Sequence, residues 1–207
     1  MAPPELVLGT TNAGKVRELA ALLIPHGIRV VSLRDCPGAV NVEETGSTFA
    51  ENASLKACQQ AAALSRWVLA EDSGLCVDAL GGAPGVRSAR FSGSDGDDEA
   101  NNSLLLSKLS GTPTASRGAH YACHAALADP QGRLVARSEG QCSGVIAEAR
   151  TGTGGFGYDP LFVVAEYHRT FGELAPEVKA VLSHRARAMR AMLPAILLHL
   201  GGRHSDG

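Results

Sequence analysis

Apolar residues at the start of the chain change from a continuous run to a helical spacing. The run Leu6–Leu8 predicts a short buried strand, and apolar residues recur at helical intervals within Val16–Ile24, which predicts an amphipathic helix. The small and polar residues between these segments therefore form the loop of a β-loop-α unit. Thr11 or Asn12 can cap the helix, because either side-chain oxygen can accept a hydrogen bond from its first turn.

This first loop is suited to an anion. Free backbone N–H groups of the first helical turn and the ammonium of Lys15 form a pocket for anionic oxygen, so a phosphate is the natural ligand. Gly9, Gly14 and Lys15 also match the GxxxxGK part of a P-loop. Val16 stands where a P-loop needs a Ser or Thr hydroxyl to hold magnesium. The pattern therefore argues against a P-loop kinase or NTPase.

Further apolar runs predict alternating strands and helices in the first half of the chain. Ile28–Leu33 predicts a strand parallel to the first one, because a helix links the two. Thr48 and Glu51 form the capping box of a long alanine-rich helix. Trp67–Ala70 predicts a strand that delivers Glu71–Gly74 at its carboxyl end, where open α/β sheets hold their ligands.

The second half contains longer β-compatible segments. A helix is predicted over Asp97–Leu109, and Ala119–Ala128 with Leu134–Ile146 predicts an antiparallel hairpin. A last helix extends from Pro176 to about Leu200, and a break at Ser183 would create a second helix start. Parallel strands followed by a hairpin predict a mixed sheet within an α/β fold.

Composition limits the ligands and the compartment. The 207 residues are 44% hydrophobic and carry a formal net charge of -2 without a Lys/Arg cluster, so neither nucleic acid nor an anionic membrane surface is expected as the main partner. Five dispersed cysteines without CxxC spacing suit reduced thiols. The N-terminus lacks the character of a signal sequence, and apolar runs such as Ala195–Leu198 are too short to span a membrane. We expect a cytoplasmic protein with a small-molecule ligand.

Two carboxylates are candidates for binding a metal. Glu43 lies in the loop before the capped helix and Asp72 at the predicted strand end, so both are expected to face the loop that contains Lys15. Oxygen ligands suit a magnesium ion that also binds substrate phosphates, and the arrangement suggests attack of an activated water on phosphorus. His120 and His124 share one face of the predicted hairpin, but without a third nearby ligand we interpret them as ordinary strand histidines.

A glycine-rich loop, Thr151–Pro160, follows the hairpin. Its glycines match GxGxxG, but it leads into an apolar strand and not into a helix, so the context contradicts a dinucleotide-binding turn. The loop presents Phe156, Tyr158 and Asp159. An aromatic ring here could stack on a base while Asp159 accepts a hydrogen bond from a ring N–H. A hairpin loop whose aromatic residues face the core explains the same pattern equally well.

Four segments together resemble a known family. They are TTNAGKVREL (residues 10–19), EETGSTFAENASLKA (43–57), AEDSGLCVDALGGAPGVRSARFSG (70–93), and GGFGYDPLF (154–162) with SHRARA (183–188). In order and spacing they resemble the inosine/xanthosine triphosphate pyrophosphatase family, and the match extends from about Leu6 to Leu198. The resemblance implies a single domain over residues 1–207, with a long mixed sheet and flanking helices that form two lobes around a central active-site cleft. Residues 201–207 are expected to be a disordered tail.

The resemblance also implies an activity. It implies a homodimeric, Mg²⁺-dependent enzyme that converts ITP, dITP or XTP to the monophosphate and pyrophosphate. The implied triphosphate-binding residues are Thr10, Thr11, Asn12, Ala13, Gly14, Lys15 and Lys56. The implied metal ligands are Glu43 and Asp72, with Asp72 also accepting the proton of the attacking water and Lys15 contributing to catalysis. The implied contacts to the rest of the substrate are Ser73, Arg90, Phe156, Gly157, Tyr158, Asp159, Lys179, His184 and Arg185.

Selectivity for the base would depend on the 6-position of the purine. A donor such as Arg185 or a backbone N–H pairs with a 6-oxo group, whereas the amino group of adenine would leave that contact unpaired. Two alternatives remain beside this hypothesis. A pyrophosphatase of the same fold acting on pyrimidine triphosphates would share the first loop but should lack the FGYD and SHR segments. A nucleotide sensor without catalytic activity would not need Glu43 and Asp72 around a metal.

Overall fold

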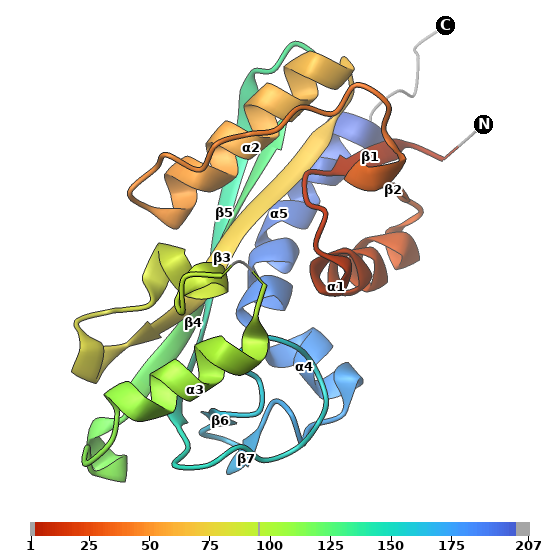
Figure 1. Ribbon diagram of the computed structural model, residues 1–207. Helices are drawn as coiled ribbons and strands as arrows, with labels where there is room; N and C mark the ends of the chain where they lie inside the picture. Colours follow the sequence, from red (N-terminus) through yellow and green to blue (C-terminus); the bar gives the residue numbers. More distant parts are fainter. Residues whose placement is uncertain (1–2, 95, 202–207) are drawn as a thin grey trace, which may run out of the picture. The chain divides into compact units, whose positions relative to one another are not determined.

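A seven-stranded mixed sheet with flanking helices forms the α/β fold of the computed structural model, which describes residues 3–94 and 96–201 (Figure 1). Hydrogen-bonded neighbours follow the order β2-β1-β3-β4-β5-β6-β7. The strands are β1 (Glu5–Leu8), β2 (Arg29–Ser32), β3 (Val68–Val77), β4 (Gly118–Ala128), β5 (Leu134–Ile146), β6 (Phe162–Val164) and β7 (Arg169–Thr170). The α-helices are α1 (Ala13–Leu23), α2 (Phe49–Leu64), α3 (Asp98–Lys108), α4 (Pro176–Leu182) and α5 (His184–Gly201). Short 3₁₀ turns occupy Ile24–His26, Leu33–Asp35, Asp78–Leu80, Gly85–Arg90 and Thr114–Ser116.

The sheet is mixed because β1 pairs in parallel with both β2 and β3, whereas β6 pairs antiparallel with β5 and β7. The chain divides into two compact units that each contain parts of the long strands. The first unit comprises Met1–Asp72, Cys123–Gly140 and Arg185–Gly207, and the second comprises Ser73–Ala122 and Gln141–His184.

In the first unit, helices cover both faces of the strands (Figure 1). Leu6 and Leu8 of β1 pack against α1 and α5, while Val7 points to the other face and packs against α2. This alternation follows from the two-residue period of a strand. The side of α2 that meets the sheet is built from alanines at four-residue spacing, Ala53, Ala57 and Ala61, so the helix can lie close to the strands.

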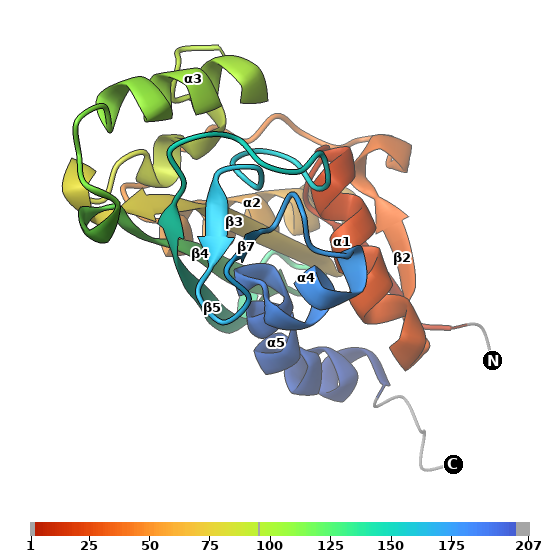
Figure 2. The same ribbon diagram turned by 90° about the horizontal axis from the view of Figure 1, so that it is seen from below.

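In the second unit, an aromatic cluster forms the centre of the core. Phe162 stacks on Phe171 with ring centroids 5.5 Å apart, and Tyr121 lies against Phe162 at 4.7 Å. Helix α3 lies along one side of the strands of this unit (Figure 2). Leu105 of the helix and its C-cap residue Leu109 belong to the same buried cluster.

Most of the predicted elements are confirmed. The hairpin is β4 and β5, the capping box of Thr48 and Glu51 is formed at α2, and the last helical stretch does break at Ser183, where the backbone is extended. Gly201 is the last residue of α5, and the rest of the predicted tail, residues 202–207, lies outside the described residues. Within the described chain, no helix is both long and apolar enough to cross a membrane.

The predicted end of β3 is wrong. We expected the strand to stop at Ala70, but it continues to Val77, so Glu71 and Asp72 lie inside it. Charged residues usually disfavour the interior of a strand, because an uncompensated buried charge is costly. Both carboxylates here are compensated by cationic side chains, which allows the backbone ladder to continue.

Candidate functional site

The loop between β1 and α1 is fixed tightly against β3. Gly9 donates its N–H to the Leu69 carbonyl at 2.8 Å, and a Cβ at Gly9 would lie only 2.9 Å from the Cβ of Ala70, so this close approach requires glycine. Asn12, and not Thr11, caps α1, because its Oδ1 accepts from the Lys15 N–H at 3.1 Å. The loop therefore turns sharply at β3 and places Lys15 beside that strand.

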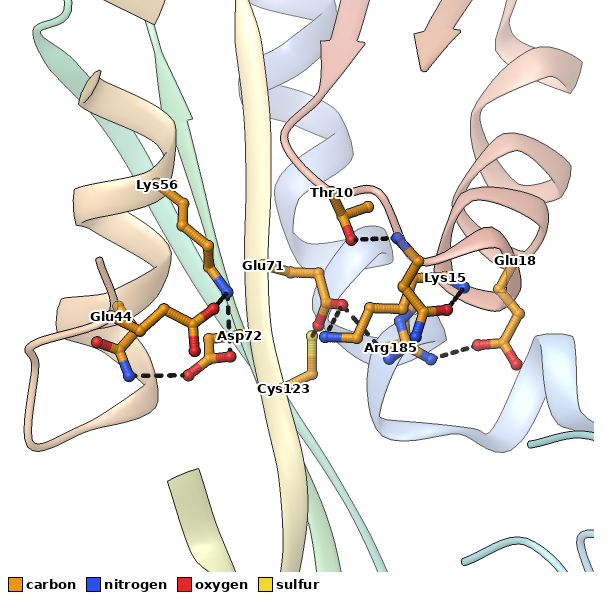
Figure 3. A network of polar contacts seen from close by, with 11 residues as sticks. Thr10, Lys15, Glu18, Glu44, Lys56, Glu71, Asp72, Cys123 and Arg185 are labelled. Atoms are coloured by element: carbon orange, nitrogen blue, oxygen red, sulfur yellow. Dashed lines mark hydrogen bonds and ion pairs between the residues drawn. The ribbon is translucent and has the colours of Figure 1, made fainter. Parts of the chain in front are cut away.

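Glu71 and Asp72 point to opposite faces of β3 (Figure 3). Successive side chains of a strand project to opposite sides, so two neighbouring carboxylates enter different surroundings. Glu71 faces the helices α1 and α5, whereas Asp72 faces α2. The two acids were predicted to follow the strand together, and because β3 continues through them they are separated by its faces.

Glu71 accepts from three buried or half-buried side chains. Lys15 Nζ lies 2.8 Å from Glu71 Oε1, Arg185 Nη2 lies 3.4 Å from the same oxygen, and Cys123 Sγ donates to Glu71 Oε2 at 3.2 Å. Arg185 also pairs with Glu18 of α1. Burial alone would raise the pKa of Glu71, but the charges of Arg185 and Lys15 outweigh it and hold that pKa well below its ordinary value. Glu71 is therefore a permanent carboxylate at neutral pH.

Asp72 has a different balance of charge. Lys56 Nζ contacts Asp72 Oδ1 at 3.1 Å and Glu44 Oε1 at 2.8 Å, and Asn52 Nδ2 donates to Asp72 Oδ2 at 3.2 Å. Burial raises the pKa of Asp72 above its ordinary value, although the charges of Lys56 and Lys15 act in the opposite direction. A buried carboxylate with a raised pKa is a stronger base than a surface aspartate, which suits a proton acceptor.

The carboxylates near Lys56 fit a hard divalent cation. Lys56 holds the oxygens of Glu44 and Asp72 together although they belong to different segments, and oxygen ligands are those that Mg²⁺ prefers. Glu43, the predicted partner of Asp72, is exposed, and its side chain makes no hydrogen bond or ion pair with Asp72 in residues 3–94 and 96–201. Within the same residues, no three His, Cys, Asp or Glu side chains form a group that could hold a metal, but Mg²⁺ commonly uses one or two carboxylates together with substrate phosphates.

Lys56 is expected to control the titration of Asp72. Because its charge opposes the effect of burial, Lys56→Met should move the pKa of Asp72 still higher than in the wild type. Carbon-13 NMR of the aspartate carboxyl groups in Mg²⁺-free protein measures this directly, with Asp72→Asn assigning the signal. Exposed Lys108 gives the matched control, since Lys108→Met should leave the titration unchanged. An Asp72 pKa that is unaltered by Lys56→Met would contradict the electrostatic assignment.

The predicted base-binding residues on the glycine-rich loop lie in the second unit. Asp159 is buried, and its Oδ2 accepts from the Phe156 N–H at 2.9 Å and from Lys179 Nζ at 2.5 Å. Lys179 Nζ also lies 4.6 Å from the centre of the Phe156 ring. Tyr158 is a core residue whose hydroxyl donates to the Ser88 carbonyl at 2.8 Å. Of the two open interpretations, the core-facing one holds for Tyr158, whereas Phe156 is half-buried.

The remaining predicted residues fall into two environments. His184 is buried and stacks on Tyr121 with centroids 4.6 Å apart in the second unit. Arg185 is buried in the first unit, where its guanidinium contacts Glu71 and Glu18. Ser73 and Arg90 are half-buried in the second unit, Arg90 at the end of a 3₁₀ turn. Their contacts to a nucleotide stay predictions.

Sequence reasoning missed residues that organise both carboxylates. They are Glu18, Glu44, Asn52 and Cys123. Two of them carried a usable signal: Glu18 lies one helical turn after Lys15, and Asn52 lies one turn before Lys56 on the capped helix. Cys123 is distant in sequence and gave no local signal.

Comparisons with known proteins identify the family of this chain. The model of the Ham1 family matches residues 6–195. A protein named dITP/XTP pyrophosphatase from Rhodopirellula baltica is 54% identical over 93% of this chain and 93% of its own length. Another of that name from Geobacillus kaustophilus is 55% identical over 89% of this chain and 90% of its own length. The Ham1 protein of Staphylococcus aureus has a TM-score of 0.81 at 39% identity, covering 94% of this chain and 98% of its own. A nucleoside-triphosphatase / dITP/XTP pyrophosphatase from Mycobacterium abscessus has a TM-score of 0.74 at 44% identity, covering 92% of this chain and 99% of its own. With a family model and relatives that span nearly its whole length, the chain belongs to the Ham1 family.

Proposed function

We propose that this protein is a nucleoside-triphosphate pyrophosphohydrolase that hydrolyses dITP, XTP and ITP to the monophosphate and pyrophosphate, and so removes non-standard purines from the nucleotide pool. The observation that carries the proposal is Asp72, a buried carboxylate with a raised pKa that contacts Lys56 and lies within the field of Lys15. The name dITP/XTP pyrophosphatase of relatives at about half identity supports this choice of substrates.

The phosphate end of the substrate would bind at the β1–α1 loop. The first-turn amides of α1 attract anionic oxygen, because the helix dipole and the unpaired N–H groups point to this loop. Lys15 is 18% exposed and can exchange its contact with Glu71 for a phosphate oxygen. Cleavage between the α- and β-phosphorus leaves negative charge on the departing pyrophosphate, and the ammonium groups of Lys15 and Lys56 offset that charge.

Asp72 would accept the proton of the attacking water. Its Oδ1 and Oδ2 are oriented by Lys56 and Asn52, so the carboxylate is fixed before a substrate arrives. Mg²⁺ would be held by Asp72 and Glu44, whose oxygens both contact Lys56, and it would supply positive charge against the phosphates when bound; Glu43 stays a predicted ligand. The water oxygen attacks phosphorus, the bridging P–O bond breaks, and the pyrophosphate leaves with the bonding electrons.

Product analysis tests the reaction. Purified protein is mixed with Mg²⁺ and each of dITP, XTP, ITP, dATP, dGTP and dUTP, and the phosphorus products are resolved by phosphorus-31 NMR. We expect pyrophosphate and the nucleoside monophosphate from the first three substrates. Orthophosphate would instead indicate an NTPase, preference for dUTP a pyrimidine enzyme, and binding without turnover a sensor. Omission of Mg²⁺ should abolish turnover. We also expect a homodimer, as the family resemblance implies, and a cytoplasmic location, as the composition indicates. Light scattering in solution tests the dimer.

Phe156 is proposed to stack on the purine base. The ring is half-buried and the Lys179 ammonium lies 4.6 Å from its centre, so a base that stacked here would contact an aromatic surface beside a cation. Phe156→Ala should raise the KM for dITP and XTP by about tenfold or more, in line with the stacking energy of about 1–3 kcal/mol per base. Lys15→Ala, by contrast, should leave the ratio of activity on XTP to that on dATP unchanged. Normal KM values in Phe156→Ala would assign the ring to the core.

A further inference from the structure

Helix α3 holds the loop that carries Phe156 through the backbone of a single residue. Asn102 Nδ2 donates to the Gly157 carbonyl at 2.8 Å, and the Gly157 N–H donates to Asp98 Oδ2 at 2.6 Å. The same Asn102 Nδ2 donates to the Asp98 carbonyl at 2.7 Å. Both polar backbone atoms of the residue next to Phe156 are therefore bound to one turn of α3, within the second unit.

The loop needs such an external support because its own backbone is unusually free. Gly155 and Gly157 have φ values of +77° and +63°, and a Cβ at Gly155 would overlap Asp159 Oδ2 at 1.9 Å. Glycine loses more conformational freedom on ordering than any other residue, so contacts from outside must fix the loop. Asp98 binds the peptide between Phe156 and Gly157 through its N–H, and Asn102 binds the next peptide through the Gly157 carbonyl, so α3 fixes the backbone on both sides of Gly157.

Other contacts hold different parts of the loop. Tyr158 is fixed in the core by its bond to the Ser88 carbonyl, and Gly154 donates to the Gly172 carbonyl at 2.9 Å. Before the loop, Arg150 donates to the Glu99 carbonyl at 3.0 Å and to Ser103 Oγ at 2.9 Å, so α3 also binds the approach to it. Within residues 3–94 and 96–201, Asn102 and Asp98 are the side chains that bind the residue directly after the ring.

Asn102 is suited to positioning rather than to general stability. It is 4% exposed, and the two carbonyls that it faces can only accept, which fixes its amide nitrogen toward them. Its Oδ1 is buried without a hydrogen-bond partner among the described residues. A buried amide oxygen without a hydrogen bond costs folding free energy. Asn102→Ala removes this unsatisfied oxygen as well as the two hydrogen bonds that the amide nitrogen donates, so the two effects on stability oppose each other.

We propose that Asn102, with Asp98, is a positioning residue that sets base selectivity. Asn102 holds the carbonyl of Gly157 and Asp98 holds its N–H, and together they hold the ring of the preceding residue, Phe156. The inference rests on the proposed role of Phe156 in stacking on the purine. It assigns to α3, which carries none of the predicted substrate contacts, control over how tightly the base is bound.

Steady-state kinetics of the full-length enzyme with Mg²⁺ test this proposal. Asn102→Ala should raise the KM for XTP and dITP about tenfold with a smaller change in kcat, because a misplaced ring weakens base binding before it affects the chemistry. Asn102→Asp puts a carboxylate against two carbonyls and should have a larger effect. Asp98→Ala, at an exposed position, should give a smaller rise and keeps the test available if Asn102 variants are unstable. Asp129→Ala is the matched control, because Asp129 is also buried and binds loop backbone, at Gln131 and Arg133, away from every predicted site residue.

A double mutant separates positioning from mere stabilisation. If Asn102 acts through the ring, Asn102→Ala should have no further effect on KM in the Phe156→Ala background, whereas an independent effect would multiply. Inhibition by tripolyphosphate, which carries no base, should be the same in wild type and Asn102→Ala. An Asn102→Ala enzyme with wild-type KM and selectivity would overturn the proposal while leaving Phe156 in place. Normal KM values in Phe156→Ala would overturn both the positioning role of Asn102 and the stacking role of Phe156. The failure of the first proposal alone can therefore be distinguished from the failure of both.

Discussion

Asp72→Asn is expected to lower kcat by about 10²- to 10⁴-fold, the usual contribution of a general base. The amide cannot accept the proton of the attacking water, but it preserves the shape of the side chain and leaves the β1–α1 loop unchanged. The dissociation constant for dITP should therefore stay within about tenfold of the wild-type value, since the loop amides and Lys15 are intact. Single-turnover kinetics give the rate and isothermal titration calorimetry gives the affinity.

The control for this substitution is an aspartate in the same unit. Asp35 lies exposed in a 3₁₀ turn after β2, so Asp35→Asn should leave both measurements unchanged. A fully active Asp72→Asn enzyme would remove Asp72 from the mechanism. A large loss of affinity with unaltered single-turnover rate would instead restrict Asp72 to binding.

Glu71→Gln is expected to lower the free energy of unfolding by about 3–5 kcal/mol, the range found when one partner of a buried ion pair is removed. Arg185 is almost fully buried and would lose its contact with Glu71, and Lys15 would lose its contact at 2.8 Å. A decrease in Tm on the order of 10 °C corresponds to this loss in a chain of this size. The exposed Glu139, with 75% of its side chain accessible, is the control, and Glu139→Gln should change stability by less than about 0.5 kcal/mol.

The same network predicts how stability depends on pH. Because the folded-state pKa of Glu71 is depressed, its contribution is fully present above the ordinary glutamate value of 4.5 and is lost as the pH falls below it toward the folded-state pKa. Urea unfolding of Mg²⁺-free protein at pH 7 and at decreasing acidic pH measures this. The difference between wild type and Glu71→Gln should narrow as the solution becomes more acidic. A constant difference would show that the loss arises from packing and not from charge.

The local structure of the first half was predictable because its signals are local. The Thr48–Glu51 capping box and the apolar spacing of α1 depend on residues within one or two turns, and both were confirmed. The family resemblance and the mixed α/β fold were confirmed as well, since they rest on several ordered motifs. The course of β3 was not predictable in this way, because charge compensation from Lys15 and Lys56 allows it to continue.

The candidate site was predictable in its residue types more than in its contacts. Lys15, Lys56 and Asp72 were identified, and the structure brings Lys56 and Asp72 together. It also brings Glu44 to Lys56, whereas the neighbouring Glu43, the predicted metal ligand, is exposed, and no local pattern distinguishes these two residues of an irregular loop. Arg185 illustrates the same limit: its carboxylate partners come from segments more than 100 positions earlier in the chain, and no local pattern reveals them.

The extended backbone at Glu71 and Asp72 separates two electrostatic environments, one on each face of β3. On one side a carboxylate is kept ionised by two cations, and on the other a carboxylate is kept more basic by burial, although only one peptide bond separates them. Inserting or deleting one residue early in β3 would shift its register by one, so that Glu71 and Asp72 would each move to the opposite face of the strand. The strand should therefore tolerate conservative replacement of its apolar residues far better than any change in its length.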